Sequence, residues 1–258
     1  MLRRVPDIFR DVTEYRGNSA ALELAQGTFN EEALYQAIEE YAVQWYELQH
    51  RPASVLDLCA ASGLAAGRVG RRIPVDFIDL VDVDEAALDY AIHRLSDGTP
   101  VCKHVVDAAS FRPERKYDLV LANSAFHHIE DGRKVDFLKQ ARLALAEDGV
   151  ILLGEHFLPP YSSFGGFRKA VESFYERLIP ELLDQGEDDD AIRVIRRSGL
   201  YCWEGQYEYK VSWNIFLWDI ARADLKIHEY RVLWAPPALR KFMAGTVAVA
   251  LKPVATPG

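Results

Sequence analysis

The chain has 258 residues, of which 49% are hydrophobic and 27% charged, as in an ordinary soluble protein with one large domain. Its net charge of −9 disfavours DNA or RNA as the main substrate, because a polyanion would be repelled. No apolar run approaches the roughly 20 residues that span a membrane, and the N-terminus lacks the apolar core of a secretory signal. The three cysteines are widely spaced, which suits a reducing compartment, so we expect a cytoplasmic protein.

The first part of the chain is predicted to be helical. Apolar residues recur at helical spacing up to about Gln49, among them Leu34, Ile38, Tyr41 and Trp45. We expect residues 1–50 to form an N-terminal helical lid and residues 51–258 to form the main domain.

From Ser54 onward, short apolar strands alternate with helical patterns. Strands are expected at 55–58, 77–81, 101–106, 117–122 and 150–153, helices through 65–69, 85–95 and 131–146, and a turn at 148–149. Alternation of this kind predicts right-handed βαβ units, and therefore an α/β fold with a mostly parallel sheet and helices on both faces.

A second helical region is expected as an insertion at about 159–224, before two final strands at 226–233 and 246–251. It is rich in aromatic residues, and Gly165-Gly166 offers a hinge. A pocket lined by such rings suits an aromatic or hydrophobic small molecule. The aromatic residues in question are Tyr201, Trp203, Tyr207, Tyr209, Trp213, Phe216 and Trp218.

The first strand runs into a turn of small residues, Cys59 to Gly63, and the second strand ends at Asp82. In a parallel sheet, ligands bind at the carboxyl ends of the strands, where backbone amides of the first turn face the ligand. A carboxylate at the end of the next strand can accept both hydroxyls of a ribose. Together the turn and Asp82 predict a nucleoside-binding site.

Five segments resemble, in order and spacing, the motifs of class I S-adenosylmethionine (SAM)-dependent methyltransferases. They are VLDLCAASG (55–63), VDVDEAALDYA (81–91), VVDAASF (105–111), YDLVLANSAFHHIED (117–131) and AEDGVILLGE (146–155). The resemblance implies a Rossmann-like, seven-stranded, mostly parallel sheet with an antiparallel last strand. It also implies SAM as the cofactor. The insertion at about 159–224 looks like the helical substrate lid that small-molecule members of this family carry in the same place.

The same resemblance assigns roles to side chains at the carboxyl edge of the sheet. Asp57 would position the turn and the methionine end of SAM, and Asp82 would bind the ribose. Asp107 would hydrogen-bond the adenine amino group. The remaining positions implied to contact the cofactor are Cys59, Ala61, Gly63, Val83, Ala108 and Asn123.

The turn departs from the family pattern, which has glycine where this chain has Cys59 and Ala61. The cost of these replacements is small if both residues hold negative φ. A dinucleotide-binding turn would need a further glycine where Leu64 stands, so hydride transfer to a nicotinamide is not expected.

Histidines and acids near the ends of two strands are the candidates for chemistry. His127 and His128 follow the fourth strand, where either could be a general base, and Glu155 follows the fifth. For each of them, packing, loop hydrogen bonding or capping is the alternative role. Tyr15 and Arg16 would close over the carboxylate of SAM, or else form a solvated surface pair.

Metal binding is not expected from these residues. Adjacent histidines such as those of HHIED (127–131) rarely face one ion together, and the acidic run 187–190 fits a solvated loop or a helix start.

We therefore expect methyl transfer from SAM to a small organic acceptor, in natural-product biosynthesis. The loop N/D-P-P-Y/F of amine methyltransferases is absent after the fourth strand, which favours oxygen or carbon over nitrogen as the methylated atom. Two alternatives stay open: a SAM-binding fold-mate without methyl transfer, and a tRNA or protein methyltransferase. The family often forms homodimers, but no heptad seam indicates one here.

Overall fold

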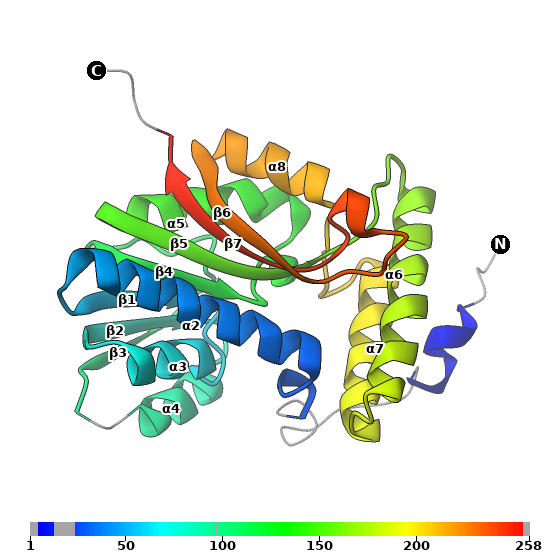
Figure 1. The fold of residues 1–258 in the computed structure, drawn as a ribbon, viewed down its shortest axis with the longest axis horizontal. Coiled ribbons are helices and arrows are strands. Elements are labelled where there is room, and N and C mark those ends of the chain that lie inside the picture. The colour runs from blue at the N-terminus through cyan, green and yellow to red at the C-terminus, as the bar shows by residue number, and fades with distance from the viewer. Residues whose placement is uncertain (1–4, 13–23, 96–97, 255–258) are drawn as a thin grey trace.

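A seven-stranded sheet forms the centre of the computed structural model, which describes residues 5–12, 24–95 and 98–254 (Figure 1). The strand order is β3-β2-β1-β4-β5-β7-β6. β1 to β5 are parallel, and β7 is antiparallel to both β5 and β6, which confirms the predicted fold class. The strands are β1 (Ala53–Leu58), β2 (Val75–Asp82), β3 (Val101–Val105), β4 (Tyr117–Asn123), β5 (Leu145–Phe157), β6 (Leu225–Trp234) and β7 (Gly245–Pro253).

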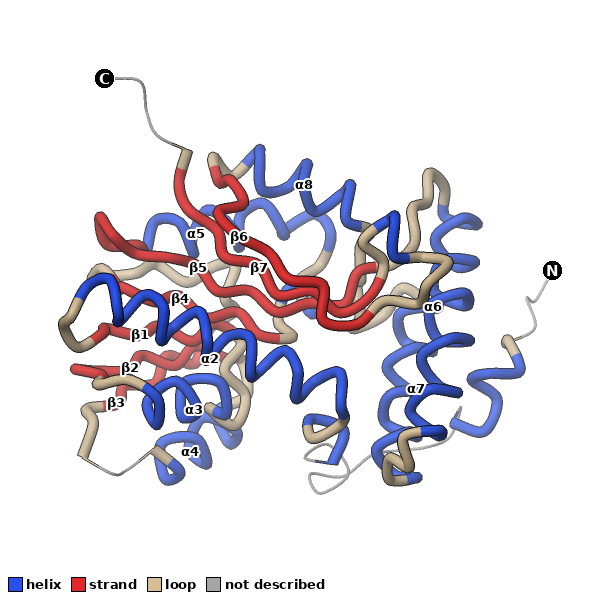
Figure 2. The backbone as a smooth tube through the Cα atoms, viewed as in Figure 1, coloured by secondary structure: helices blue, strands red, loops and turns tan. Residues whose placement is uncertain are grey.

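Helices cover both faces of this sheet (Figure 2). One hydrophobic core joins α2, α3 and α4 to one face, and a second joins α5 and α8 to the other. Because both faces are covered, central strands such as β1 are buried along their whole length. These helices are α2 (Phe29–Gln49), α3 (Leu64–Arg72), α4 (Glu85–Arg94), α5 (Lys134–Ala144) and α8 (Trp213–Arg222).

Two further helices, α6 (Phe164–Asp184) and α7 (Asp189–Glu204), stand side by side at one end of the sheet, at the right of Figure 1. They share a third core with the short 3-10 helix η1 (Asp7–Val12), and Phe9 of η1 packs edge-on against Tyr175 of α6. The chain between β5 and β6 thus contributes α6 and α7 beside the sheet and α8 behind it. Short 3-10 helices also occur at η2 (Phe126–His128), η3 (Asp131–Arg133) and η4 (Arg240–Phe242).

The structure corrects two predicted element boundaries. Residues 148–149 were expected in a turn, but they lie inside β5, which begins at Leu145. The pairing with β4 jumps there from Tyr117–Leu145 to Leu119–Val150, so the extra residues bulge within the strand. The helix expected at 131–146 is shorter, because its first turn is the 3-10 helix η3.

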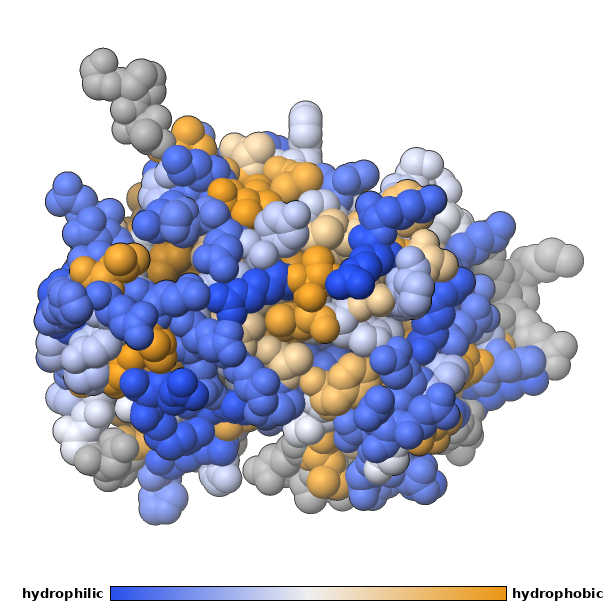
Figure 3. All heavy atoms as spheres, viewed as in Figure 1, coloured by the Kyte–Doolittle hydropathy of each residue, from blue (hydrophilic) through white to orange (hydrophobic). Residues whose placement is uncertain are grey.

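Hydrophilic residues cover both flanks of the face drawn in Figure 3, while apolar residues gather in its middle, between the α2 side and the α6–α7 pair. No helix in the described part of the chain is long and apolar enough to cross a membrane.

Candidate functional site

A cavity of about 600 Å³ opens at the carboxyl ends of β1, β2 and β4 and reaches β5. Its walls include Asp57, Asp82, Asn123 and His156 from these strands, and α6 and α7 close it on the side away from the sheet. A volume of a few hundred Å³ at the carboxyl edge of a parallel sheet is typical of a small-ligand site.

The turn after β1 lines this cavity with small side chains held in a strained backbone. Cys59 has φ 58° and Ala61 has φ 45°, so both occupy the left-handed region that favours glycine. The condition for a small cost, negative φ at both residues, is therefore not met. A non-glycine residue in this region costs about 1–2 kcal/mol. Burial, followed by the nearby Asp82, raises the pKa of the Cys59 thiol, which keeps it protonated and inert.

Gly63 has a structural role in the same turn. It caps α3 with φ 68°, and a Cβ on it would lie 2.9 Å from the Cβ of Ala91 on α4. Gly63 is absent from the described cavity wall, whereas Cys59 and Ala61 are part of it. Glycine is therefore required at position 63, because α3 begins there and packs closely against α4.

Two buried or half-buried carboxylates hold the turn in place. Asp82 accepts hydrogen bonds from the backbone amides of Ala61 (2.9 Å) and Asp84 (3.0 Å). Asp57 accepts one from the amide of Ala66 (3.2 Å) at the start of α3. Burial, aided by the negative charge of Asp82, raises the pKa of Asp57 to about 7.

The predicted adenine-side residues also reach the cavity. Val83 is 69% exposed, and Ala108 and Asp107 line the wall beside it. Both carboxylate oxygens of Asp107 already have partners, the amide of Ala109 (2.8 Å) and the guanidinium of Arg133 (2.6 Å). A ligand that hydrogen-bonds to Asp107 would thus share it with Arg133.

Asn123, at the end of β4, contributes a buried amide to the wall. Its side chain interacts with the hydroxyl of Tyr35 on α2, which also lines the cavity. A Cβ on Gly154 would lie 2.1 Å from Oδ1 of Asn123, so the glycine on β5 makes room for the amide. The amide and the hydroxyl together make this part of the wall polar.

At the other end of the cavity, Glu155 orients His127. One oxygen of Glu155 lies 2.6 Å from Nδ1 of His127, and the other accepts from the backbone amide of His127 (2.9 Å). A carboxylate only accepts, so Nδ1 carries the hydrogen and Nε2 keeps its lone pair. Burial, then the charge of Lys210, lowers the pKa of His127 well below its usual value, and the ring is neutral at pH 7.

The three predicted catalytic residues are thus close together but not equivalent. His127 and His128 line the cavity, and their ring centroids are 4.2 Å apart. Glu155 is 1% exposed and lies behind His127, outside the described wall. It is placed to orient His127 and not to touch a ligand.

Glu208 and Lys210 reach the same place from the segment between α7 and α8, and the sequence analysis missed them. A carboxylate oxygen of Glu208 lies 3.5 Å from Nε2 of His127 and 2.5 Å from Nζ of Lys210. The amide of Tyr209 donates to the carbonyl of His127 (2.6 Å), which holds the segment against η2. Burial would raise the pKa of Glu208, but Lys210 outweighs it and lowers the value to about 2.

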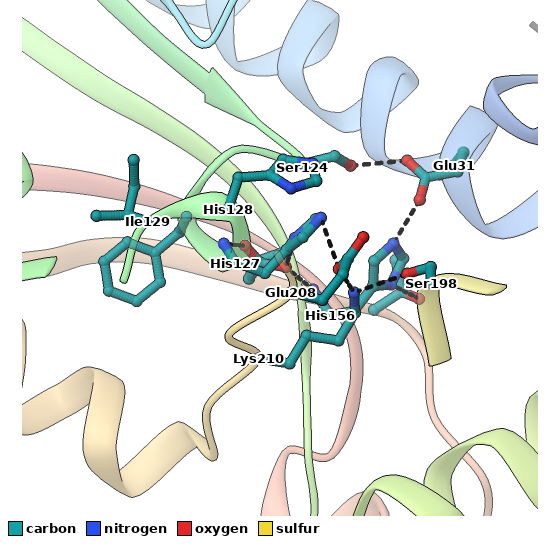
Figure 4. Close-up of polar contacts among 12 residues, drawn as sticks. Glu31, Ser124, His127, His128, Ile129, His156, Ser198, Glu208 and Lys210 are labelled. Atoms are coloured by element: carbon teal, nitrogen blue, oxygen red, sulfur yellow. Dashed lines mark hydrogen bonds and ion pairs between the residues drawn. The ribbon is translucent and has the colours of Figure 1, made fainter. Parts of the chain in front are cut away.

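A third polar contact ties α2 to the strand ends. Figure 4 shows Glu31 of α2 bridging Ser124 and His156. Its oxygens lie 2.7 Å from Oγ of Ser124 and 2.6 Å from Nε2 of His156. Burial would raise the pKa of Glu31, but the interactions with His156 and Ser124 lower it. The start of α2 is therefore fixed over the cavity by charged hydrogen bonds.

Two expectations need revision or stay outside the described structure. Of the seven aromatic residues at 201–218, only Tyr207 is part of the described cavity wall. Three of the others, Trp203, Trp213 and Phe216, pack in cores, and Trp218 is 67% exposed. The rings that line the cavity come from α2 and α6 instead: Tyr35, Phe174 and Tyr175. Tyr15 and Arg16 lie outside the described residues.

The fold and the cavity at its strand ends define a Rossmann-like methyltransferase domain, and comparison with known proteins agrees. Residues 55–149 match a family model described as a methyltransferase domain. A malonyl-[acyl-carrier protein] O-methyltransferase of Ilyobacter polytropus is 31% identical over 78 residues, which are 30% of this chain and 29% of that protein. A tRNA1(Val) (adenine(37)-N6)-methyltransferase of Flavobacterium johnsoniae is 30% identical over 112 residues, 41% of this chain and 46% of that protein.

A solved structure is similar over nearly the whole chain. The plantazolicin methyltransferase BpumL, in complex with a triazolic desmethylPZN analog and SAH, has a TM-score of 0.60 at 14% identity and covers 91% of this chain and 90% of that one. The chain spans less than half the length of the two curated relatives above. The protein therefore contains a class I SAM-dependent methyltransferase domain, which confirms the resemblance and the cofactor class stated from the sequence.

The strained turn gives a first prediction. Ala61→Gly is expected to raise the free energy of unfolding by about 1 kcal/mol, because glycine adopts φ 45° without steric cost. Urea denaturation measures it. The control Ala33→Gly, inside α2, is expected to lower the same quantity by about 1 kcal/mol. Equal destabilisation by both changes would show that the turn is not strained.

The raised pKa of Asp57 gives a second prediction. Between about pH 4 and about pH 7 the folded protein holds a proton on Asp57 that the unfolded chain has lost, so this group destabilises the fold as pH rises. The difference in unfolding free energy, wild type minus Asp57→Asn, is expected to fall between about pH 4 and about pH 7 and to be constant above that. A difference that is constant with pH would mean that Asp57 is ionised throughout.

Proposed function

We propose that the protein transfers a methyl group from SAM to an oxygen or carbon atom of a small organic acceptor. The observation that carries the proposal is the single cavity that joins the turn after β1 to the neutral ring of His127. Cofactor and acceptor would then share one enclosed space, as an in-line transfer requires. We further propose that the protein acts in the cytoplasm on an intermediate of natural-product biosynthesis.

The residues around the turn fit SAM. Small side chains at Cys59 and Ala61 leave the backbone accessible, Asp82 offers a carboxylate for ribose hydroxyls, and Asn123 offers a buried amide. When bound, SAM supplies an electrophilic methyl group on a sulfonium. Without a ligand, the surroundings of Asp57 disfavour its carboxylate form and raise its pKa. The positive charge of SAM would stabilise that carboxylate, so the site suits a cationic ligand.

The opposite end of the cavity supports a small acceptor with an apolar body. Leu178 and Phe174 of α6 and Ile195 of α7 form one wall, while Ser198 and Lys210 add polar atoms. The lone pair on Nε2 of His127 is available to the reacting atom of the acceptor. Glu155 fixes the orientation of the ring through Nδ1. As a general base His127 would accept a proton from a hydroxyl or an acidic carbon.

A tRNA or protein acceptor is the second candidate, because relatives of this chain include tRNA methyltransferases. The net charge of −9 and the wall formed by α6 and α7 favour the small molecule. The third candidate, SAM binding without transfer, is supported by the positive φ of Cys59 and Ala61, where the family has glycine.

Cofactor binding can be tested by calorimetry with SAM. Asp82→Ala is expected to weaken SAM binding about tenfold or more, since a charged hydrogen bond is worth roughly 1.5–3 kcal/mol. Asp89→Ala, which removes an exposed carboxylate of α4 that is not part of the described cavity wall, serves as the control and should retain most of the affinity. Equal affinity of the Asp82 variant and the wild type would remove Asp82 from the site.

Methyl transfer can be tested with deuterated-methyl SAM and mass spectrometry, offering a panel of small hydroxy-aromatic compounds and, separately, total tRNA. We expect label on small molecules only. With the best acceptor, His127→Ala is expected to lower kcat at least about 100-fold while SAM affinity is unchanged. The exposed His228→Ala is the control. Label on tRNA alone would overturn the proposed acceptor class, and tight SAM binding without any labelled product would favour the third candidate.

A further inference from the structure

Three side chains at the acceptor end of the cavity offer the atoms of a metal site. One ligand atom from each of His127, His128 and Glu208 lies within 4.8 Å of the other two. The two histidines come from η2, and the glutamate comes from the segment that follows α7. The prediction of no metal considered the adjacent histidines and the acidic run 187–190, because the sequence did not indicate that Glu208 joins the histidines.

The spacing of two of these atoms fits an ion better than a direct contact. Nε2 of His127 and a carboxylate oxygen of Glu208 are 3.5 Å apart. A charge-assisted hydrogen bond between them would be about 2.7–2.9 Å long. With metal–ligand bonds of about 2.1 Å, a separation of 3.5 Å corresponds to an angle of about 113° at the ion, close to tetrahedral. Without an ion, the lone pair on Nε2 of His127 faces the negatively charged carboxylate of Glu208, and the two repel each other.

The atoms behind the histidines are those expected of metal ligands. Nδ1 of His127 is 2.6 Å from Glu155, and Nδ1 of His128 is 3.4 Å from the carbonyl oxygen of Tyr207. Both partners are acceptors, so both rings keep the lone pair on Nε2. A carboxylate or carbonyl behind a histidine is the usual way in which proteins fix the tautomer of a metal ligand.

The net charge of this polar network is negative, which favours binding of a cation. One lysine competes with the cation and lowers the affinity of the site for it. Glu31, Glu155 and Glu208 are within this polar network, and Lys210 is its one ammonium group among the described residues. While the histidines are neutral, three carboxylates and one ammonium leave a net charge of −2, which one divalent ion would cancel. Lys210 donates to the same oxygen of Glu208 that faces His127, so it competes with an ion for that ligand.

We propose that His127, His128 and Glu208 bind a divalent transition-metal ion, with coordination positions left open toward the cavity. Two imidazoles and a carboxylate suit ions such as Zn²⁺, Co²⁺ or Fe²⁺ rather than Mg²⁺ or Ca²⁺. The inference rests on the proposed function, and it names the acceptor class: a molecule with an oxygen that can fill an open position of the ion. His127 then acts as a ligand instead of a free base.

The test uses the full chain, free of any affinity tag and dialysed against a chelator. Co²⁺ is titrated in while its visible absorption is recorded, and Zn²⁺ binding is measured by calorimetry. We expect one ion per chain and the absorption of a cobalt centre of low coordination number. His127→Ala and Glu208→Gln are each expected to weaken binding at least about tenfold. His93→Ala, on the exposed side of α4, is the control and should bind as the wild type does.

Lys210→Met keeps the proposal testable if the other variants fold poorly. Removing the competing ammonium is expected to strengthen Co²⁺ binding about tenfold or more and to increase the rise in melting temperature on adding the ion. Absence of stoichiometric binding, or equal affinity in wild type and His127→Ala, would overturn the metal site. Methyl transfer that persists at full rate in the chelated protein would overturn the role of the ion in holding the acceptor, and would leave the proposed function and the general-base role of His127 standing.

Discussion

The carboxylate of Glu155 is the contact on which the arrangement of the site depends. It is buried at the end of β5 and is held by the backbone amides of His127 and His156 and by the ring of His127. These bonds join the loop after β4 to the neighbouring strand. They also decide which nitrogen of His127 carries a hydrogen. Backbone position and side-chain chemistry are thus set by a single acid.

The parts of the site that the sequence predicted are those fixed by local pattern. Strand periodicity placed Asp57, Asp82 and Asn123 at strand ends, and parallel strands bring their ends to one edge. Glu155 was identified for the same reason, although its role differs, since the sequence does not say whether it faces the cavity.

Glu208 and Lys210 could not be found in this way. They lie in an irregular segment between two helices, and they meet His127 only because the amide of Tyr209 bonds to the carbonyl of His127. Such a pairing across 80 residues has no periodic signal. The interpretation of the aromatic run failed for a related reason: α7 and α8 place Trp203, Trp213 and Phe216 in cores, and side-chain direction depends on packing that the sequence alone does not give.

The turn after β1 keeps the backbone conformation that glycine would adopt, although Cys59 and Ala61 replace the glycines of the family pattern. Cys59 and Ala61 hold the positive φ values that glycine would adopt freely, so the backbone path is imposed by its surroundings. Asp82 supplies part of that constraint through the amide of Ala61, and the contact of Gly63 with α4 supplies another part. A side chain expected to bind the ribose therefore also holds the turn.

The two ends of the cavity differ in how their charge is balanced. At the turn, Asp57 and Asp82 repel each other, and the hydrogen bonds that they accept come from backbone amides. A cationic ligand would relieve that repulsion, as the sulfonium and ammonium groups of SAM would do. At the acceptor end, Lys210 keeps Glu208 ionised inside the protein. The proposed acceptor would therefore need no charge of its own there, and an apolar body with one oxygen would suit both the polar network and the wall of α6 and α7.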